Sequence, residues 1–325
     1  MPNPYYTGPV SDHFDGERFF NPVHFPDKGL RDILHWRMTS RAARWPARVA
    51  SRQIVPEARV EATQVTLVGH MTVLIQAAGR NILTDPVWSE RASPVSFAGP
   101  KRVCPPAVDF ADLPPIDVVL LSHNHYDHLD MATIARLVVR DDPRIVTPLG
   151  NDTIVRKAVP AARLETGDWW DRFDLGGGVA ATMLPAQHWS SRTGRDARRA
   201  LWCGFMVHAP DALVYFAGDT GYGDGGIFRE TRARLGRPDL ALIPIGAYAP
   251  RWFMAAQHCD PEEAVQILLD LDARTAFGVH WGVFQLSDEG REAPRLELAD
   301  ALMRRQVRPE RFVAAEPGEV WRAPG

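Results

Sequence analysis

The sequence predicts an α/β protein, in which strands and helices alternate along the chain. Short apolar runs typical of buried strands recur between residues 65 and 279, and several are followed by apolar residues at helical spacing. At Asp260 an N-cap residue, a proline and Glu263 mark the start of a helix, which leads into a late strand at 275–279. This order of elements is typical of a sheet covered by helices.

The composition excludes several broad classes of protein. The chain has 325 residues, of which 45% are hydrophobic, so it can bury a substantial core and is not disordered. A formal net charge of −3 argues against a nucleic-acid partner, because nucleic-acid affinity depends on phosphate-neutralising cations. We therefore expect no nucleic-acid binding.

The distribution of cysteines and apolar runs predicts a cytoplasmic protein. Cys104, Cys203 and Cys259 form no CxxC pair, which indicates reduced thiols rather than disulfides or thiolate metal ligands. The first residues lack the layout of a signal peptide, and no run of 18 apolar residues occurs. Contact with a membrane would therefore be peripheral.

The first 60 residues form a separate segment of the predicted organisation. Residues 1–29 are rich in Pro, Gly and aromatic side chains, which predicts an extended arm over a core. Residues 30–52 have apolar residues at helical spacing beside a row of arginines, and Pro46 divides them into two helical pieces. With Trp36 and Trp45, this amphipathic segment suits either a lipid interface or packing on the core.

From residue 61 onward the pattern is that of the main domain. Residues 65–75 are β-rich, and a turn at 78–80 joins them to a hairpin partner strand at 81–84. Many Pro, Ser and Gly residues predict a loop at 89–116. A buried strand at 117–121, a helix at 131–140 and strands near 144–147, 179–184, 201–207, 213–217 and 240–245 follow.

The segment 122–128 is the strongest indication of chemistry. It places three imidazoles and one carboxylate directly after a predicted strand, and these are ligands that zinc prefers. His123 and His125 alternate to the same side and can chelate one ion, while Asp127 and His128 can reach a second ion. A single structural zinc is the alternative, but structural sites favour thiolates and no cysteine is near.

Three isolated residues at predicted strand ends complete this metal site. His188, Asp219 and His280 each follow an apolar run. In our interpretation His123, His125 and His188 hold one ion, Asp127, His128 and His280 hold the other, and Asp219 bridges the two. The sequence therefore predicts two divalent ions, zinc by ligand type, with iron or manganese as alternatives.

This order of ligands resembles the metallo-β-lactamase superfamily. The resemblance implies a four-layer αββα sandwich with a dinuclear centre at one edge of its sheets, and it makes residues 61–325 the catalytic domain. It also implies that Asp85, in Leu83-Thr84-Asp85-Pro86, orients a metal-binding histidine. His70, in Gly69-His70-Met71-Thr72, is interpreted as structural rather than as a ligand.

Over residues 60–315 the sequence resembles one particular family of this superfamily. The segments 81–130, 216–222, 243–248 and 250–264 and the motif His280-Trp281-Gly282 are similar to the family of N-acylphosphatidylethanolamine-hydrolysing phospholipases D. The resemblance implies a zinc-dependent phosphodiesterase that releases an N-acylethanolamine and phosphatidic acid. It places His258 near the metals as a residue that contacts phosphate or donates a proton, while Asp127 or Asp219 holds the nucleophile.

Other functions are compatible with the same ligands. A hydrolase of another substrate, such as a sugar-phosphate lactone, shares this ligand pattern, and a non-catalytic scaffold is a further alternative. Aromatic residues in the predicted loops, such as Trp189 and Trp252, favour an apolar substrate. Arg251, Lys101 and Arg102 are candidates to hold a phosphate, although loop cations are commonly only solvated. The oligomeric state stays open.

Overall fold

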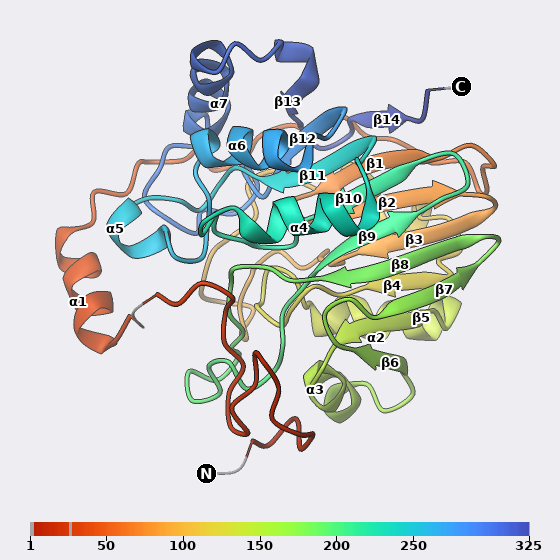
Figure 1. The fold of residues 1–325 in the computed structure, drawn as a ribbon, viewed down its shortest axis with the longest axis horizontal. Coiled ribbons are helices and arrows are strands. Elements are labelled where there is room, and N and C mark those ends of the chain that lie inside the picture. Colours follow the sequence, from red (N-terminus) through yellow and green to blue (C-terminus); the bar gives the residue numbers. More distant parts are fainter. Residues whose placement is uncertain (1–2, 26–27, 325) are drawn as a thin grey trace.

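The computed structural model describes residues 3–25 and 28–324, and it consists of two seven-stranded sheets packed face to face (Figure 1). The first sheet has the order β14-β1-β2-β3-β4-β5-β6, with β1 (Gln64–Gly69), β2 (Thr72–Ala77), β3 (Arg80–Thr84), β4 (Val118–Leu120), β5 (Arg144–Pro148), β6 (Arg163–Gly167) and β14 (Val320–Arg322). The second has the order β13-β12-β11-β10-β9-β8-β7, with β7 (Arg172–Gly176), β8 (Val179–Leu184), β9 (Gly204–His208), β10 (Leu213–Phe216), β11 (Leu240–Pro244), β12 (Thr275–Val279) and β13 (Phe312–Ala314).

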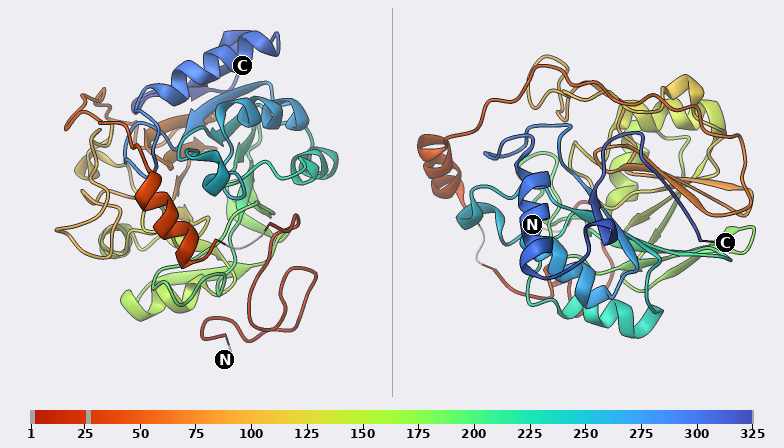
Figure 2. Two further views of the ribbon diagram at one scale, coloured as in Figure 1. Left: turned by 90° about the vertical axis from the view of Figure 1, so that its left-hand side faces the viewer. Right: turned by 90° about the horizontal axis from the view of Figure 1, so that it is seen from above.

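Helices cover the outer face of each sheet. The inner faces meet in one buried cluster that includes Val73 and Ile75 from the first sheet and Phe205, Phe216 and Leu242 from the second. Outside the first sheet lie α2 (Met131–Asp141) and α3 (Asn151–Ala158), and outside the second lie α4 (Gly226–Leu235), α6 (Pro261–Leu271) and α7 (Ala293–Arg304) (Figures 1 and 2). The predicted αββα sandwich is confirmed.

The capping signals in the sequence fix the start of α6. The Asp260 carboxylate accepts a hydrogen bond from the Glu263 backbone N–H at 2.9 Å, and the Glu263 carboxylate accepts one from the Asp260 backbone N–H at 3.1 Å. Pro261 occupies the first turn, where its missing N–H costs nothing. Val265 and Leu268 then pack on the second sheet, and burial of each stabilises the fold by about 1.5–3 kcal/mol.

The β-rich segment at 65–75 forms two antiparallel strands, β1 and β2, and β2 forms the expected hairpin with β3. Their side chains are buried almost throughout, so hydropathy shows no break between them. The chain reverses at Gly69 and His70, where φ is +154° and +57°. Glycine adopts the φ of +154° at position 69 without strain, and Gly69 was the sequence signal for this reversal.

The N-terminal residues pack against the edge of the sandwich. Phe14 and Phe19 are buried in a cluster with Leu201 and Trp202, which anchors the arm of residues 3–25. A short helix, α1 (Leu30–Thr39), lies beside α5 (Arg251–Met254) at one side of the molecule (Figures 1 and 2).

The second helical piece expected before residue 52 is wrong, since residues 40–63 contain neither helix nor strand. There the backbone pairs with a neighbouring loop instead, as when the Val49 N–H donates to the Val103 carbonyl at 2.7 Å.

Elements with weak local signals were not anticipated. They include α3, β6, β7, α4, α7, β13 and β14, and the 3-10 turns at Phe110–Asp112 and Pro309–Arg311. The strand expected near 201–207 begins only at Gly204. In the part of the chain that the structure describes, no helix is long and apolar enough to cross a membrane.

Candidate active site

The predicted ligands follow strands that end at one edge of the two sheets. β3 to β6 are parallel, as are β10 to β13, so their carboxyl ends lie together. Asp85 follows β3, residues 123–128 follow β4, His188 follows β8, Asp219 follows β10 and His280 follows β12. Face-to-face packing of the sheets brings these strand ends into one buried site.

A first group of possible ligand atoms comprises His123, His125, His188 and Asp219, all within 4.8 Å of one another. The His125 Nδ1 atom lies 3.0 Å from His123 Nε2 and 3.2 Å from His188 Nε2. His188 Nε2 lies 3.6 Å from Asp219 Oδ2. The structure thus brings together the histidines expected to share one ion.

A second group comprises His70, Asp127, His128 and His280, again within 4.8 Å. Asp127 Oδ2 lies 3.3 Å from His280 Nε2 and 3.4 Å from His128 Nε2. It also lies 3.0 Å from His70 Nε2, so His70 contacts this group directly and is not remote from the site. The left-handed backbone at His70 directs its side chain toward Asp127. In the sequence, only Gly69 before it indicated a turn here.

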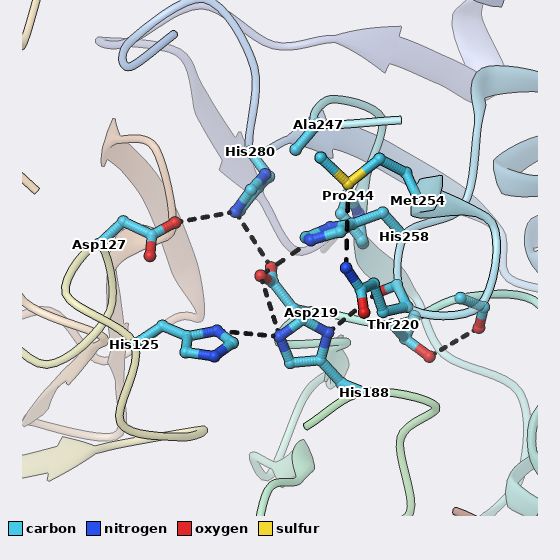
Figure 3. A network of polar contacts seen from close by, with 12 residues as sticks. His125, Asp127, His188, Asp219, Thr220, Pro244, Ala247, Met254, His258 and His280 are labelled. Carbon is cyan, nitrogen blue, oxygen red and sulfur yellow. Dashed lines mark hydrogen bonds and ion pairs between the residues drawn. The ribbon is translucent and has the colours of Figure 1, made fainter. Parts of the chain in front are cut away.

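Asp219 contacts both groups from the centre of the site (Figure 3). Its Oδ1 lies 3.2 Å from His280 Nε2, and its Oδ2 lies 3.2 Å from His128 Nε2. His258 approaches the same carboxylate, with Nδ1 4.0 Å from Oδ2. The carboxylate therefore occupies the position that a bridging ligand would need.

Neighbouring groups fix which ring nitrogen faces the site. The Asp85 carboxylate lies 2.7 Å from His128 Nδ1, which donates to it and leaves Nε2 toward Asp219. Asp85 also accepts hydrogen bonds from the Ser122 backbone N–H at 2.7 Å and from the Ser122 hydroxyl at 2.6 Å. His188 Nδ1 donates to the Gln257 carbonyl at 2.9 Å, so its Nε2 presents a lone pair to the first group.

The buried carboxylates and histidines of the site shift one another's pKa values. Burial favours the neutral form of Asp219, but the charges of His128 and His280 hold the pKa of this carboxyl well below its usual range. Conversely, burial lowers the pKa of His280, yet Asp219 and Asp127 raise it to about 9. Burial and neighbouring imidazoles lower the pKa of His125 to about 3, which leaves a neutral ring able to bind a cation.

The arrangement fits divalent metal ions. A tetrahedral ion with ligands at about 2.0–2.1 Å separates the ligand atoms by about 3.3 Å, close to the spacings within both groups. His128 Nε2 and Asp219 Oδ1, which face the site, are buried and have no hydrogen-bond partner among the described residues. Cys104, Cys203 and Cys259 are buried and belong to neither group among those residues.

The sequence candidates for a phosphate-binding cation are engaged elsewhere. Arg251 forms ion pairs with Glu263 at 2.7 Å and Asp260 at 3.2 Å, and it donates to the His258 carbonyl at 2.8 Å. Arg102 donates to the Val87 carbonyl at 2.8 Å, while Lys101 pairs with Glu90 at 3.7 Å. Arg251 therefore supports the loop that carries His258 and does not line the cavity beside the site.

That cavity has a volume of about 730 Å³ and reaches His188. Residues 18–25 of the arm, α1 and the segment at 253–257 form its walls. Phe20, Trp36 and Phe253 give it an aromatic lining, and Arg18, Lys28 and Arg37 add positive charge. Sequence reasoning missed this role of the arm, because its contacts join residues far apart in the chain. Asn21, for example, accepts a hydrogen bond from the His188 backbone N–H at 3.0 Å.

A half-buried arginine, Arg192, holds the loop that supplies four of the predicted ligands. Arg192 Nη1 donates to the carbonyls of Asn124 at 2.8 Å and Leu129 at 2.9 Å. Its guanidinium lies 4.0 Å from the centre of the Tyr126 ring, and the Tyr126 hydroxyl donates to the Arg192 carbonyl at 2.8 Å. Sequence reasoning gave no role to Arg192.

Arg192→Ala is expected to weaken divalent-metal binding by about 10-fold, because supporting groups typically set ligand orientation to that degree. Isothermal titration of metal-free protein with zinc measures the affinity, and thermal unfolding of the same sample reports on the fold. Arg195→Ala is the matched control, since Arg195 is an exposed arginine of the same loop. Equal zinc affinity in all three proteins would contradict this role of Arg192.

The comparisons with known proteins agree with the fold and with the site. Residues 80–281 match the family model described as a beta-lactamase superfamily domain. An isothiocyanate hydrolase from Delia radicum gut bacteria has a TM-score of 0.63 at 21% identity, covering 80% of this chain and 99% of that one, so the two share the fold. The chain belongs to the beta-lactamase superfamily of metal-dependent hydrolases.

Within that superfamily its relatives include phospholipases D. It is 38% identical over 269 residues to N-acyl-phosphatidylethanolamine-hydrolyzing phospholipase D 1 of Caenorhabditis elegans, covering 79% of this chain and 75% of that protein. It is 36% identical over 218 residues to the mitochondrial N-acyl-phosphatidylethanolamine-hydrolyzing phospholipase D of Saccharomyces cerevisiae. That match covers 65% of this chain and only 46% of the yeast protein.

Proposed function

We propose that this chain is a zinc-dependent phosphodiesterase of the phospholipase D type, which hydrolyses N-acylphosphatidylethanolamine-like phospholipids to an N-acylethanolamine and phosphatidic acid. The observation that carries the proposal is the pair of ligand groups around Asp219 beside a cavity with aromatic and cationic walls. The activity in the names of the worm and yeast relatives supports this reaction.

In this proposal the chain holds two zinc ions. His123, His125 and His188 hold the first, Asp127, His128 and His280 hold the second, and Asp219 contributes to both. Two bound zinc ions supply a water molecule that loses its proton near neutral pH, and they stabilise negative charge on the phosphate. His70 would contact and orient the Asp127 carboxylate, from which its Nε2 lies 3.0 Å away.

The protein residues orient the reactants and handle the proton. The Asp127 and Asp219 carboxylates accept hydrogen bonds and so hold the attacking water in place. The buried His258 Nδ1 atom has no hydrogen-bond partner among the described residues, and it lies beside the Asp219 carboxylate. Burial lowers the pKa of His258, so its ring is neutral, and we assign to it the relay of the proton that the attacking water loses to the oxygen of the departing N-acylethanolamine when the phosphorus–oxygen bond breaks.

The cavity fits a substrate with an apolar part and a negative charge. Its aromatic residues offer surface to acyl chains, and its arginine and lysine side chains attract the phosphodiester. We expect purified protein to release phosphatidic acid from N-acylphosphatidylethanolamine in mixed micelles, and to lose this activity with its zinc after chelation. Elemental analysis before and after chelation counts the ions per chain.

A soluble sugar-phosphate lactone serves as the competing substrate. Two ions per chain with hydrolysis of the lactone alone would retain the metal centre and contradict the phospholipid substrate. Fewer than one ion per chain with neither product formed would favour a non-catalytic scaffold.

We further propose that α1 contacts the membrane from which a phospholipid is taken. One side of α1 packs on the protein, where the Trp36 and Phe253 rings lie 4.8 Å apart. Leu34 and Met38 are 59% and 76% exposed, beside the arginines of this segment. Exposed apolar residues next to cations are typical of a helix at a lipid interface.

The double variant Leu34→Glu with Met38→Glu is expected to reduce sedimentation with anionic phospholipid vesicles at least about 10-fold. Each substitution removes apolar contact with the lipid and adds a negative charge, which the anionic vesicles repel. Activity on a detergent-dispersed monomeric substrate should stay within about two-fold. Val139→Glu on α2 is the matched control, since Val139 is an apolar residue on another helix that is even more exposed, at 89%. Unchanged sedimentation of the double variant would contradict membrane contact through α1.

A further inference from the structure

A second cavity, of about 330 Å³, lies away from the candidate active site. It is found where β12 begins at Thr275, whereas His280 follows the other end of that strand, about 16 Å away at the usual rise of a strand. The cavity is lined by Arg237, Leu269, Arg274, Arg305, Gln306, Val307, Arg308 and Arg311. Five of these residues are arginines, and among the described residues no Asp or Glu lines it.

Two of the five arginines have a structural role at the end of α6. Arg237 Nε donates to the Asp272 carbonyl at 2.6 Å, and Arg311 Nη2 donates to the Ala273 carbonyl at 2.8 Å. Cations at a helix C-terminus stabilise its unpaired carbonyl groups. Stabilisation of the helix end therefore accounts for the presence of Arg237 and Arg311, but not for that of the other three arginines.

Carboxylates that do not line the cavity hold two of the remaining arginines. Arg274 Nε lies 3.1 Å from an Asp239 carboxylate oxygen, and Arg305 Nε lies 2.5 Å from a Glu262 oxygen. Arg305 Nη1 also donates to the Gln266 side-chain oxygen at 3.0 Å, and each guanidinium still has N–H groups that these contacts do not use. Arg308 has neither an ion pair nor a side-chain hydrogen bond to any described residue.

The positive charge at this place exceeds the negative charge that contacts it. Asp239, Glu262 and Asp272 are the carboxylates in ion-pair contact with the five arginines. Two of these carboxylates are shared with further arginines, since Glu262 also pairs with Arg304 and Asp272 with Arg232. The whole chain has a net charge of −3, so a local cationic cavity is not a consequence of composition.

We propose that this cavity binds a phosphate group, at a site separate from the metal centre. Guanidinium groups bind phosphate through paired hydrogen bonds, and a bound phosphate would relieve the mutual repulsion of the five cations. The cavity is open to solvent but concave, which favours a single phosphate group over a flat membrane surface. Both a free phosphate compound and a lipid headgroup carry the required chemistry.

The test is isothermal titration of the zinc-loaded full chain with inorganic phosphate and with pyrophosphate. We expect one pyrophosphate per chain in addition to any bound at the zinc centre, with an affinity that falls as salt rises, and weaker binding of phosphate at this cavity. The double variant Arg274→Ala with Arg308→Ala should weaken pyrophosphate binding at least 10-fold, and Arg308→Glu should do the same. Arg195→Ala is the matched control for loss of a surface arginine, and thermal unfolding verifies that each variant is folded.

The outcomes separate this site from the metal centre and from a membrane face. Pyrophosphate binding that the cavity variants leave unchanged, or no binding of either probe, would overturn the proposal. Sedimentation with phosphatidic acid vesicles in addition to pyrophosphate binding, both lost in the variants, would identify a headgroup as the source of the phosphate. Pyrophosphate binding without sedimentation would identify a free phosphate compound. Sedimentation with anionic vesicles while neither soluble probe binds would make the surface a membrane contact and overturn the proposed pocket.

Discussion

For the proposed reaction, Asp219→Asn is expected to lower kcat/KM on N-acylphosphatidylethanolamine by about 10³-fold or more and to reduce the content of the proposed zinc in the purified protein. The Asp219 carboxylate lies 3.2 Å from both His128 Nε2 and His280 Nε2, and 3.6 Å from His188 Nε2. An amide has no negative charge and offers one oxygen, so it cannot serve both ligand groups. Loss of several kcal/mol of charge stabilisation in a two-metal site corresponds to a rate effect of this size.

Elemental analysis and steady-state kinetics on the same preparation test this prediction. Asp109→Asn is the matched control, because Asp109 is an exposed aspartate in a loop and its side chain caps no helix. Circular dichroism verifies that the Asp219→Asn protein is folded. Two zinc ions per chain together with wild-type turnover in Asp219→Asn would show that the assigned ligands are wrong.

The order of polar residues along the chain predicted that His123, His125, Asp127, His128, His188, Asp219 and His280 meet, but it did not predict the contact of His70 with Asp127. Each of His188, Asp219 and His280 follows a strand, and parallel strands place such residues at a common edge. The alternation of His123 and His125 after β4 similarly predicted that both side chains face one group. Local sequence is informative here because the site is assembled from strand ends, whose positions follow from hydropathy.

Contacts between distant segments could not be predicted in the same way. Asn21 and His188 are far apart in sequence, and their hydrogen bond depends on the packing of Phe14 and Phe19 beneath the arm. Arg251 was a candidate for phosphate binding, but folding places it against Glu263. Pairing of charges depends on tertiary geometry, which composition and periodicity do not encode.

Asp85→Asn is expected to weaken zinc binding by about 10–100-fold, although Asp85 belongs to neither of the groups around Asp219 and Asp127. Its carboxylate accepts three hydrogen bonds, from His128 Nδ1 and from the backbone and hydroxyl of Ser122. An asparagine amide would place N–H donors against these donors. The His128 ring would then lose the partner that directs its Nε2 toward Asp219.

Ser122→Ala is the comparison, since it removes one of the three hydrogen bonds to Asp85 together with the contact of the Ser122 hydroxyl with His123 Nδ1 at 2.9 Å. We expect its effect on zinc affinity to be smaller than that of Asp85→Asn. Urea unfolding of the metal-free proteins separates a general loss of stability, about 1–3 kcal/mol for an unsatisfied buried group, from the effect on the site. If Asp85→Asn lowered stability but left zinc affinity unchanged, Asp85 would support the fold without orienting His128. A fall in zinc affinity beyond the loss of stability is expected, because the Asp85 carboxylate contacts the ring that presents a ligand atom.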